Sequence, residues 1–407
     1  MYYKIKTCRA CSSKRLQKKI ILKPMPLGDK YASKKNLFNR FIEINIIECK
    51  NCNHLQTSTT TDAQKLYSKF LSRPQAINQN LSKDYMDYAK DLFKYINKKD
   101  LVVDIGSNDG GFLNLFRKKG FKNLVGVEPA KNLSYHANKK KIKTINDFFS
   151  SKVVSKIYKK FNKKAKIVIN NHSLSNIHNV NEVIKNVSHI LHDKGIYSIQ
   201  TFYTVDVIKK KMLENFNHEH IHYFFVTTIN KIAKQYDLEV FKVFGVKAKG
   251  GSIRVYLGRR GMQKIHSSVK LFINKEKKFL KNKKIILEIK KFIKNNRKNI
   301  IKIINKNNFK KIIGYGTSIG ATTFVTQYDL SKHIKYFVDD DKYRQKKFSP
   351  GYNIYVASNK IINSFKPDLI IIFAPLYIKK IISKIKNNFG VIPILAIWPK
   401  VKLIKNY

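Results

Sequence analysis

Four cysteines stand in two closely spaced pairs near the start of the chain, Cys8-x2-Cys11 and Cys49-x2-Cys52. No other cysteine occurs in the 407 residues. Each pair can bend around one metal ion, and together the pairs offer the four thiolates of a tetrahedral zinc site. Chance pairs, a redox motif and disulfides are the alternatives, and disulfides are uncommon in a chain without a secretion signal. We predict zinc with four protein ligands, a structural metal with no open coordination position.

A glycine-rich turn follows the apolar run that begins at Leu101. Glycines let the backbone pass close to a ligand, and the start of the following helix presents free N–H groups toward it. One βα unit later, Glu128 ends a second apolar run and is placed to accept hydrogen bonds from both hydroxyls of a ribose. The residues that we expect to bind a nucleoside-containing cofactor here are Asp104, Gly106, Asn108, Asp109, Gly110 and Glu128.

The order of residues in this turn distinguishes two classes of cofactor. A dinucleotide-binding Rossmann turn has Gly-x-Gly-x2-Gly. The order here, Asp-Ile-Gly-Ser-Asn-Asp-Gly-Gly, is typical of class I methyltransferases, which use S-adenosylmethionine. Asp147 and Phe148 follow a third expected strand and would lie near the adenine. An ordinary tight turn with surface acids is the alternative, and we predict the methyltransferase sheet.

Two later segments carry histidines. Asn171, His172 and His178 follow a fourth expected strand, and the carboxyl ends of parallel strands line ligand sites. We assign Asn171 to the cofactor and both histidines to the candidates for chemistry. The second segment contains His218, Glu219, His220 and His222, an alternation that would place the three histidines on one side of a strand. A general base, a metal-binding stripe and ordinary packing are the three interpretations of this segment.

Residues further along could contact a substrate. Arg254 follows two glycines beside an expected strand, and it could pair with a phosphate or be a solvated strand residue. Tyr315 lies in a second glycine loop, and Asp339 to Asp341 end the strand after it. That loop could bind a dinucleotide, help to hold a substrate, or be purely structural.

Alternating apolar runs and helical patterns predict an α/β fold around these residues. Residues 263–309 have helical spacing of apolar residues and no glycine or proline, so we expect one or two long amphipathic helices there. The expected parts are a small zinc-binding domain at 1–60, a methyltransferase domain at 61–262 with a helical lead-in at 61–97, the helical linker at 263–309, and a Rossmann-like substrate-binding domain at 310–407.

The charge is strongly positive, with 82 Lys plus Arg against 26 Asp plus Glu. The lysines are spread along the whole chain together with an excess of Ile and Asn, which favours a compositional bias over a nucleic-acid partner, although a basic surface suits a phosphate-bearing substrate. No run of about 18 apolar residues predicts a membrane span. The first residues have no apolar core of signal-peptide length, so we expect a cytoplasmic protein. We also expect a monomer or a homodimer.

Taken in order, these motifs resemble the sugar C-methyltransferases that act on nucleotide-linked 4-keto deoxysugars. The resemblance covers nearly the whole chain. It includes the cysteine pairs, the glycine turn, Val-Glu-Pro at Glu128, the histidine after the fourth strand, the His-Glu-His segment, Gly-Gly-Ser-x-Arg at Arg254, and a C-terminal Rossmann-like unit.

The resemblance implies a mechanism and roles for single residues. A ketone at C-4 acidifies the proton at C-3, a histidine removes it, and the carbon attacks the sulfonium methyl group. By the match, His220 is the base with Glu219 beside it, His178 is the active-site histidine after the fourth strand, and His218 joins the catalytic candidates. The implied C-terminal lobe holds the nucleotide-sugar, with Asn217, Arg254 and Tyr315 as substrate-side candidates.

The chain departs from the family pattern at two places. Asn217 replaces a usual tyrosine, and Lys249 stands where the family often has histidine. An RNA methyltransferase or RNA-binding protein is the competing interpretation, based on the charge and the zinc motif. It is disfavoured because the chain has no catalytic Pro-Cys, and Asn-Asn-His-Ser stands after the fourth strand in place of an Asp-Pro-Pro-Tyr-like segment. An inactive binding module is a third interpretation.

Overall fold

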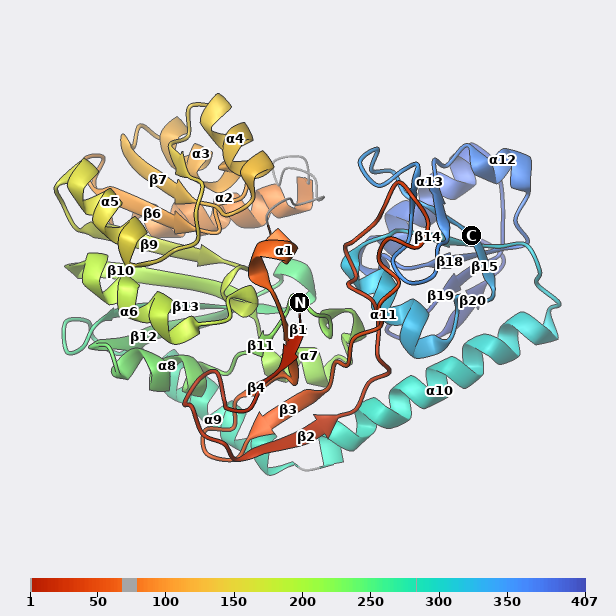
Figure 1. Ribbon diagram of the computed structural model, residues 1–407, viewed down its shortest axis with the longest axis horizontal. Coiled ribbons are helices and arrows are strands. Elements are labelled where there is room, and N and C mark those ends of the chain that lie inside the picture. The colour runs from red at the N-terminus through yellow and green to blue at the C-terminus, as the bar shows by residue number, and fades with distance from the viewer. Residues whose placement is uncertain (1, 68–78, 283) are drawn as a thin grey trace.

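The computed structural model describes residues 2–67, 79–282 and 284–407. Two α/β units lie at opposite ends of its longest axis, and the N-terminal segment runs between them (Figure 1). Part of the expected helical lead-in, residues 68–78, lies outside the described residues. No helix that the structure describes is both long and apolar enough to span a bilayer.

The N-terminal unit is a small antiparallel sheet completed by a strand from elsewhere in the chain. Its four-stranded order is β11-β4-β3-β2, and β1 pairs separately with β5. β11 comes from the histidine-rich segment, more than 160 residues after β4. The strands are β1 (Tyr2–Lys4), β2 (Leu16–Ile20), β3 (Ile46–Cys49), β4 (Leu55–Thr57), β5 (Thr59–Thr61) and β11 (His222–Tyr223).

The central unit is a seven-stranded sheet in the order β12-β13-β10-β9-β6-β7-β8. Strands β6 to β10 pair in parallel, whereas β13 is antiparallel to both β10 and β12. The strands that pair in parallel are apolar because helices cover both faces of such sheets. The strands are β6 (Leu101–Ile105), β7 (Asn123–Val127), β8 (Thr144–Ile145), β9 (Ala165–Asn171), β10 (Leu191–Phe202), β12 (Leu238–Val246) and β13 (Ser252–Arg259).

Helices connect these strands. The α-helices are α1 (Ala63–Tyr67), α2 (Gln79–Phe93), α3 (Gly111–Lys118), α4 (Lys131–Lys139), α5 (Ser151–Phe161), α6 (Val180–Ile190), α7 (Thr204–Lys209) and α8 (Val226–Lys234). Short 3-10 turns are η2 (Leu174–Asn176), η3 (Leu213–Asn215) and η4 (Ala248–Gly250). β6 has β7 on one side and β9 on the other, so the chain reverses direction across the sheet at β6 and β9. The carboxyl ends of such a strand pair form the usual ligand crevice.

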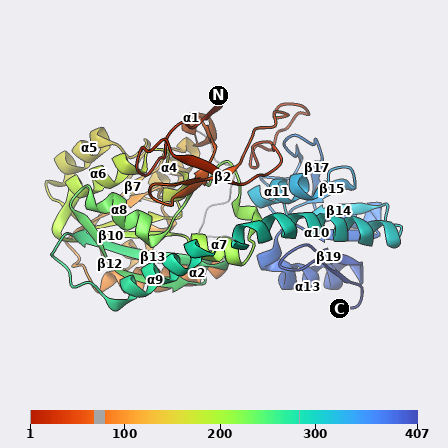
Figure 2. The same ribbon diagram turned by 90° about the horizontal axis from the view of Figure 1, so that it is seen from below.

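Two helices, α9 (Ser267–Lys281) and α10 (Lys284–Lys306), occupy the region where the apolar spacing predicted one or two. Their inward-facing residues are buried, among them Phe279, Ile289 and Ile300. α10 contacts α7, β2 and α11, and therefore touches all three units (Figures 1 and 2). The predicted amphipathic stripe is thus used for packing between units.

The C-terminal unit is a second seven-stranded sheet, in the order β16-β17-β15-β14-β18-β19-β20. Its five central strands are parallel, and both edge strands are antiparallel. The elements are β14 (Ile312–Tyr315), α11 (Ile319–Tyr328), β15 (Ile334–Val338), β16 (Lys347–Phe348), β17 (Tyr355–Ala357), α12 (Ile361–Phe365), β18 (Leu369–Ile372), η5 (Pro375–Tyr377), α13 (Ile378–Phe389), β19 (Ile394–Ala396) and β20 (Lys402–Ile404).

A buried ion pair joins the N-terminal segment to the C-terminal unit. Asp29 and Arg344 lie 2.7 Å apart, and each side chain is only 10% exposed. Arg344 also donates to the Thr317 carbonyl. Beside this pair, a Cβ on Gly28 would lie 2.7 Å from the Ile319 side chain, so the segment can approach α11 only as glycine.

Replacing Arg344 with methionine is expected to lower the free energy of unfolding by about 3 kcal/mol, because Asp29 would be left as an unpaired buried charge. Denaturant titration measures the change. The matched control is Arg297→Met, since the Arg297–Asp329 pair is exposed and such pairs contribute about 0–1 kcal/mol. Equal losses in the two variants would contradict the prediction.

Candidate active site

The glycine turn after β6 is shaped by close packing. Gly106 has φ of 73°, and a Cβ there would lie 2.6 Å from the Ser173 side chain. Gly110 has φ of 74° and precedes α3. A positive φ disfavours residues other than glycine. The turn therefore brings the start of α3 beside the loop after β9, as the sequence predicted for a cofactor-binding loop.

Glu128 reaches back to this turn from the end of β7. One carboxylate oxygen accepts from the Asn108 N–H and the other from the Ala130 N–H, both at 2.9 Å. Burial raises the pKa of Glu128, while these two backbone donors counteract the rise. Asn146 donates to the carbonyls of Glu128 and Pro129 and so fixes the strand end. Each carboxylate oxygen keeps a second lone pair, which fits a ribose with two hydroxyls.

The two aspartates of the turn are placed differently. Asp104 is buried, one of its carboxylate oxygens has no hydrogen-bond partner, and burial raises its pKa to about 8. Asp109 is fully buried and pairs with Lys140 at 2.7 Å. It also accepts from the Gly111 N–H. The Asp109 carboxylate holds α4 against the turn, and its expected contact with the cofactor stays a prediction.

The loops after β8 and β9 hold the remaining cofactor candidates. Asn171 is 8% exposed, and neither its amide nitrogen nor its amide oxygen has a partner among the residues that the structure describes. A buried amide without partners is costly unless a ligand completes it. Asp147 accepts from the N–H of Phe148, and both side chains are partly exposed. These three residues remain predictions for the cofactor.

The histidine-rich segment is not a strand before His222. The expected alternation onto one side of a strand is therefore wrong, because the turns between η3 and β11 direct the His218 and His222 rings toward the N-terminal segment and the His220 ring toward β10. His218 points to the Ile42 carbonyl at 3.3 Å. His222 lies 2.9 Å from His54 and 2.9 Å from the Ile177 carbonyl. His220 alone of the three contacts Phe202, at the carboxyl end of β10.

His220 is held as a neutral imidazole. Its Nδ1 lies 3.2 Å from the Asn215 carbonyl, which can only accept, and 3.2 Å from the Asn217 amide nitrogen, which can only donate. Both contacts hold Nδ1, and the tautomer with a proton on Nδ1 leaves a free lone pair on Nε2. The pKa of His220 is lowered to about 4, mainly by burial and in addition by the positive charge of Lys249. Asn217 accepts from the N–H groups of Glu219 and His220. Asn217 is buried and shapes this turn, so its expected substrate contact stays a prediction.

Glu219 points toward the N-terminal segment. The pKa of Glu219 is raised to about 8. Burial is the main cause and the charge of Asp29 adds to it, while the charges of Lys30 and Arg344 act in the opposite direction. Tyr67, at the end of α1, lies within electrostatic reach of Glu219, and its own pKa is raised by burial. Lys30 donates to the Leu66 carbonyl beside it. Glu219 is thus surrounded by groups from three units.

The two histidines after β9 are separated in space. His172 lies with its ring 5.1 Å from Phe202, on the same aromatic ring that His220 contacts. His178 instead contacts Tyr3 and Arg9 of the zinc-binding unit. No contact joins His178 to His220 within the described residues. The structure therefore brings His172 to the site and leaves His178, which the resemblance favoured, beside the cysteine cluster.

Arg254 and Tyr315 are also satisfied internally. Arg254 is 4% exposed, donates twice to Gln200 at 2.9 and 2.7 Å, and stacks over Tyr88 at 3.7 Å. Tyr315, at the end of β14, donates to Asp340, which follows β15 and has an exposed side chain. The Arg254 guanidinium is enclosed by Gln200 and Tyr88, and its expected phosphate contact stays a prediction. Gln200 carries no motif by which it could have been selected beforehand. It connects Arg254 to Asp84 and lies 3.5 Å from His172.

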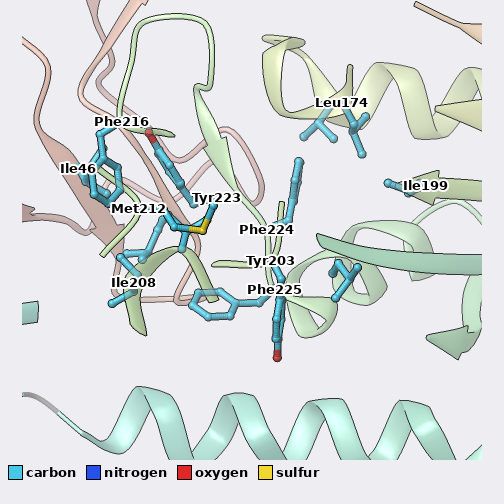
Figure 3. Packing of buried hydrophobic residues seen from close by; sticks show 14 of the residues in the cluster. Ile46, Leu174, Ile199, Tyr203, Ile208, Met212, Phe216, Tyr223, Phe224 and Phe225 are labelled. Carbon is cyan, nitrogen blue, oxygen red and sulfur yellow. The ribbon is translucent and has the colours of Figure 1, made fainter. Parts of the chain in front are cut away.

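A continuous apolar core fixes the segment that carries His220. Phe216 and Tyr223 flank the histidines in the sequence, and Figure 3 shows both rings packed near Ile46 of β3 and Met212. Phe224 points toward Leu174 of η2 in the same view. Thr323 of α11 donates to the Phe216 carbonyl. The segment is therefore clamped by all three units before any ligand binds.

The four cysteines converge as a metal site. Their sulfur atoms all lie within 4.8 Å of one another, with Cys8–Cys52 at 3.7 Å and Cys11–Cys49 at 3.6 Å. A tetrahedral zinc with Zn–S bonds of about 2.3 Å requires sulfur separations of about 3.8 Å. A disulfide would require about 2.05 Å. The cluster therefore fits zinc, and the four cysteines leave no ligand position open.

Comparison with known families matches each part of this arrangement. Three family models match in order: a zinc binding domain at residues 8–67, a methyltransferase domain at 77–243, and a C-methyltransferase C-terminal domain at 247–391. The chain is an enzyme of the S-adenosylmethionine-dependent C-methyltransferase type. This C-methyltransferase uses S-adenosylmethionine as methyl donor, and zinc is its structural metal.

Individual relatives differ in how much they cover. C-methyltransferase NovU from Streptomyces niveus is 26% identical over 293 residues, which is 71% of this chain and 69% of NovU. A solved S-adenosylmethionine-dependent methyltransferase from Clostridium acetobutylicum ATCC 824 covers 46% of this chain and 93% of its own, at 14% identity and a TM-score of 0.36. The match to the PH0226 protein from Pyrococcus horikoshii OT3 covers 49% of this chain and 100% of that protein, with 17% sequence identity and a TM-score of 0.39.

Replacing Glu128 with alanine is expected to raise the dissociation constant of S-adenosylmethionine by about tenfold to hundredfold, because hydrogen bonds to a charged group contribute about 1.5–3 kcal/mol. Isothermal titration calorimetry measures the change. Glu288→Ala is the control, since Glu288 is an exposed acid on α10. A dissociation constant that is the same in both variants would refute the ribose contact.

Proposed function

We propose that this C-methyltransferase methylates C-3 of a nucleotide-linked 4-keto deoxysugar through an enolate formed by His220. The observation that carries the proposal is the state of His220. Its ring packs against Phe202 with a pKa lowered to about 4, so it is uncharged at neutral pH, and Nδ1 is held by Asn215 and Asn217, which leaves Nε2 as the nitrogen for the substrate. A general base needs that state at neutral pH. No other histidine of its segment lies next to Phe202.

The proposed reaction balances around this base. His220 Nε2 accepts the C-3 proton, the C–H electron pair forms the C-3–C-4 double bond, and the carbonyl π pair moves onto the C-4 oxygen. When bound, S-adenosylmethionine supplies the methyl group, which leaves sulfur with the S–C bond pair remaining on that atom. The C-4 carbonyl then reforms as C-3 bonds to the methyl carbon. Holding the sugar carbon in line with the methyl group provides much of the rate.

The acceptor class rests on several supports. NovU, a relative over most of the chain, is itself described as a C-methyltransferase. The motif order resembles the sugar-acting members. A nucleotide diphosphate also suits a chain in which cationic residues exceed acidic residues by 82 to 26. We assign residues 310–407 as the lobe that helps to hold the nucleotide and residues 61–262 as the catalytic domain.

The test is mass spectrometry of purified protein with S-adenosylmethionine and a small panel of nucleotide-linked 4-keto sugars in deuterated water. We expect a mass increase of one methyl group on one sugar. Without a methyl donor, we expect deuterium to enter at C-3. If S-adenosylmethionine binds but neither change occurs with any sugar, the sugar assignment is wrong, and RNA should be tested next, with the salt dependence of binding as readout.

A further inference from the structure

Lys249 lies on a strained turn between β12 and β13. Its φ is 50°, and it is followed by Gly250 at 84° and Gly251 at 143°. A Cβ on Gly250 would lie 2.7 Å from Met212, and one on Gly251 would lie 2.6 Å from the Lys210 ammonium group. The two glycines therefore let the turn press against the residues after α7. Positive φ at a residue other than glycine costs free energy and concentrates at functional sites.

The side chain of Lys249 reaches the same aromatic ring as the two histidines. Its Nζ is 5.7 Å from the centre of the Phe202 ring. His220 and His172 lie 4.9 and 5.1 Å from that ring. The positive charge of Lys249 lowers the pKa of both histidines, which places it electrostatically beside them.

No carboxylate forms an ion pair with Lys249 among the residues that the structure describes. The acid with the largest effect on it is Asp84, which accepts a hydrogen bond from Gln200 and lies 3.8 Å from Arg254. Burial lowers the pKa of Lys249 to about 8, so the ammonium form still predominates at pH 7. The Lys249 side chain is partly buried, and a cation withdrawn from water without a counter-charge is costly. The site is consequently complementary to a negative charge that arrives or develops there.

We propose that Lys249 is a catalytic residue whose ammonium group binds the oxygen that becomes negatively charged when His220 removes the substrate proton. This inference rests on the proposed function and specifies how the enolate is stabilised. A preorganised cation beside the forming oxyanion stabilises the transition state more than the ground state, which raises turnover more than affinity. Lys249 donates a hydrogen bond to the C-4 oxygen and keeps its proton throughout the reaction.

The test compares Lys249→Met, which keeps the length of the side chain without the charge, with Lys249→Arg, which keeps a cation. Lys247→Met is the matched control, because Lys247 is exposed on the same turn. Turnover, the Michaelis constant for the sugar, and deuterium uptake at C-3 without methyl donor are measured for each. We expect Lys249→Met to lose about 10²–10³-fold in turnover and in deuterium uptake. Lys249→Arg should recover part of both, and Lys247→Met should resemble the parent protein.

Other outcomes overturn the inference in distinguishable ways. A raised Michaelis constant with unchanged turnover means that Lys249 binds the ground-state substrate. If the parent protein is active and Lys249→Met keeps full activity, the role of Lys249 is rejected while the proposed function stands. A parent protein that is silent with every sugar rejects the proposed function, and this role with it.

A readout without substrate separates a folding defect from the proposed role. The imidazole resonances of His220 and His172 are titrated by NMR in the parent and in Lys249→Met. The groups that face these rings are Lys249, the Asn215 carbonyl, Gln200 and, for His172, also His220 and Arg254. Removing the cation should raise the pKa of both histidines, and unchanged titration in a folded variant overturns the placement.

Discussion

Replacing His220 with asparagine is expected to lower methyl transfer by about 10³-fold and to abolish deuterium uptake at C-3. A positioned general base contributes roughly 10²–10⁴-fold, and asparagine has no lone pair basic enough to accept a carbon-bound proton. The His220 contacts with Asn215 and Phe202 are local, so the fold and the binding of S-adenosylmethionine should survive. Coupled mass spectrometry of both reactions makes the measurement.

The informative control is His178→Asn. The resemblance gave His178 an active-site role, whereas the structure places it against Tyr3 and Arg9 of the zinc-binding unit. We expect this variant to keep turnover within about threefold of the parent, the range of changes outside a catalytic group. Equal losses of turnover in His220→Asn and His178→Asn would contradict this placement and show that His178 takes part in the reaction.

The pH profile of deuterium uptake should report the same base. His220 must be neutral to accept a proton, and its pKa is lowered to about 4, chiefly by burial and further by Lys249. Because the folded-state pKa is lowered, the base stays available as pH falls, and uptake is lost only as pH approaches that value. We expect no inflection near 6.5, the usual histidine value. An acid limb centred there in the parent protein would contradict this assignment.

The parts of the molecule that depend on local sequence could be predicted. The Cys8-x2-Cys11 and Cys49-x2-Cys52 pairs predict a metal cluster because two short loops around one ion need little else, and their four sulfur atoms do converge. The glycine turn after β6 and Glu128 could be predicted for a similar reason, because strand, turn and helix start are contiguous. The two helices before residue 307 follow from their apolar spacing.

The placement of single charged groups could not be predicted, because their partners are distant in sequence. Asp109 is taken by Lys140, and Arg254 by Gln200 and Asp84. The alternation of His218, His220 and His222 suggested a strand, but the ring of His218 contacts the segment around Ile42 and that of His222 contacts His54. Tertiary partners from another unit override a local period-two pattern. Lys249 was visible only as a departure from the family pattern.

The zinc cluster and the site share a sheet. β4 follows the cysteine pair at 49 and 52, and it pairs with β11 through Gln56 and His222. Arg9, next to Cys8, donates to the carbonyls of Thr57 and Thr59 and so ties the cluster to the end of that sheet. β11 begins two residues after His220. The metal therefore supports the base through one strand pair, although the two do not touch.

Replacing Cys49 with serine is expected to remove zinc from the protein, unfold the N-terminal unit and abolish methyl transfer. Cys49 is fully buried, and hydroxyl oxygen is a poor ligand for zinc compared with thiolate. Zinc binding contributes about 10–16 kcal/mol in zinc-finger peptides, which is as large as the roughly 5–15 kcal/mol of net stability of a typical domain. Because β11 would lose β4, the turn that holds His220 would lose one of its clamps.

Elemental analysis should find one zinc per chain in the parent and a large loss in Cys49→Ser, with activity falling in parallel. Lys14→Ser is the control, an exposed position between the two cysteine pairs. Binding of S-adenosylmethionine should weaken less than turnover, because the glycine turn and Glu128 lie in the central sheet and have no contact with the cysteines among the described residues. A zinc-free variant that keeps turnover would show that the central sheet positions His220 without the N-terminal unit.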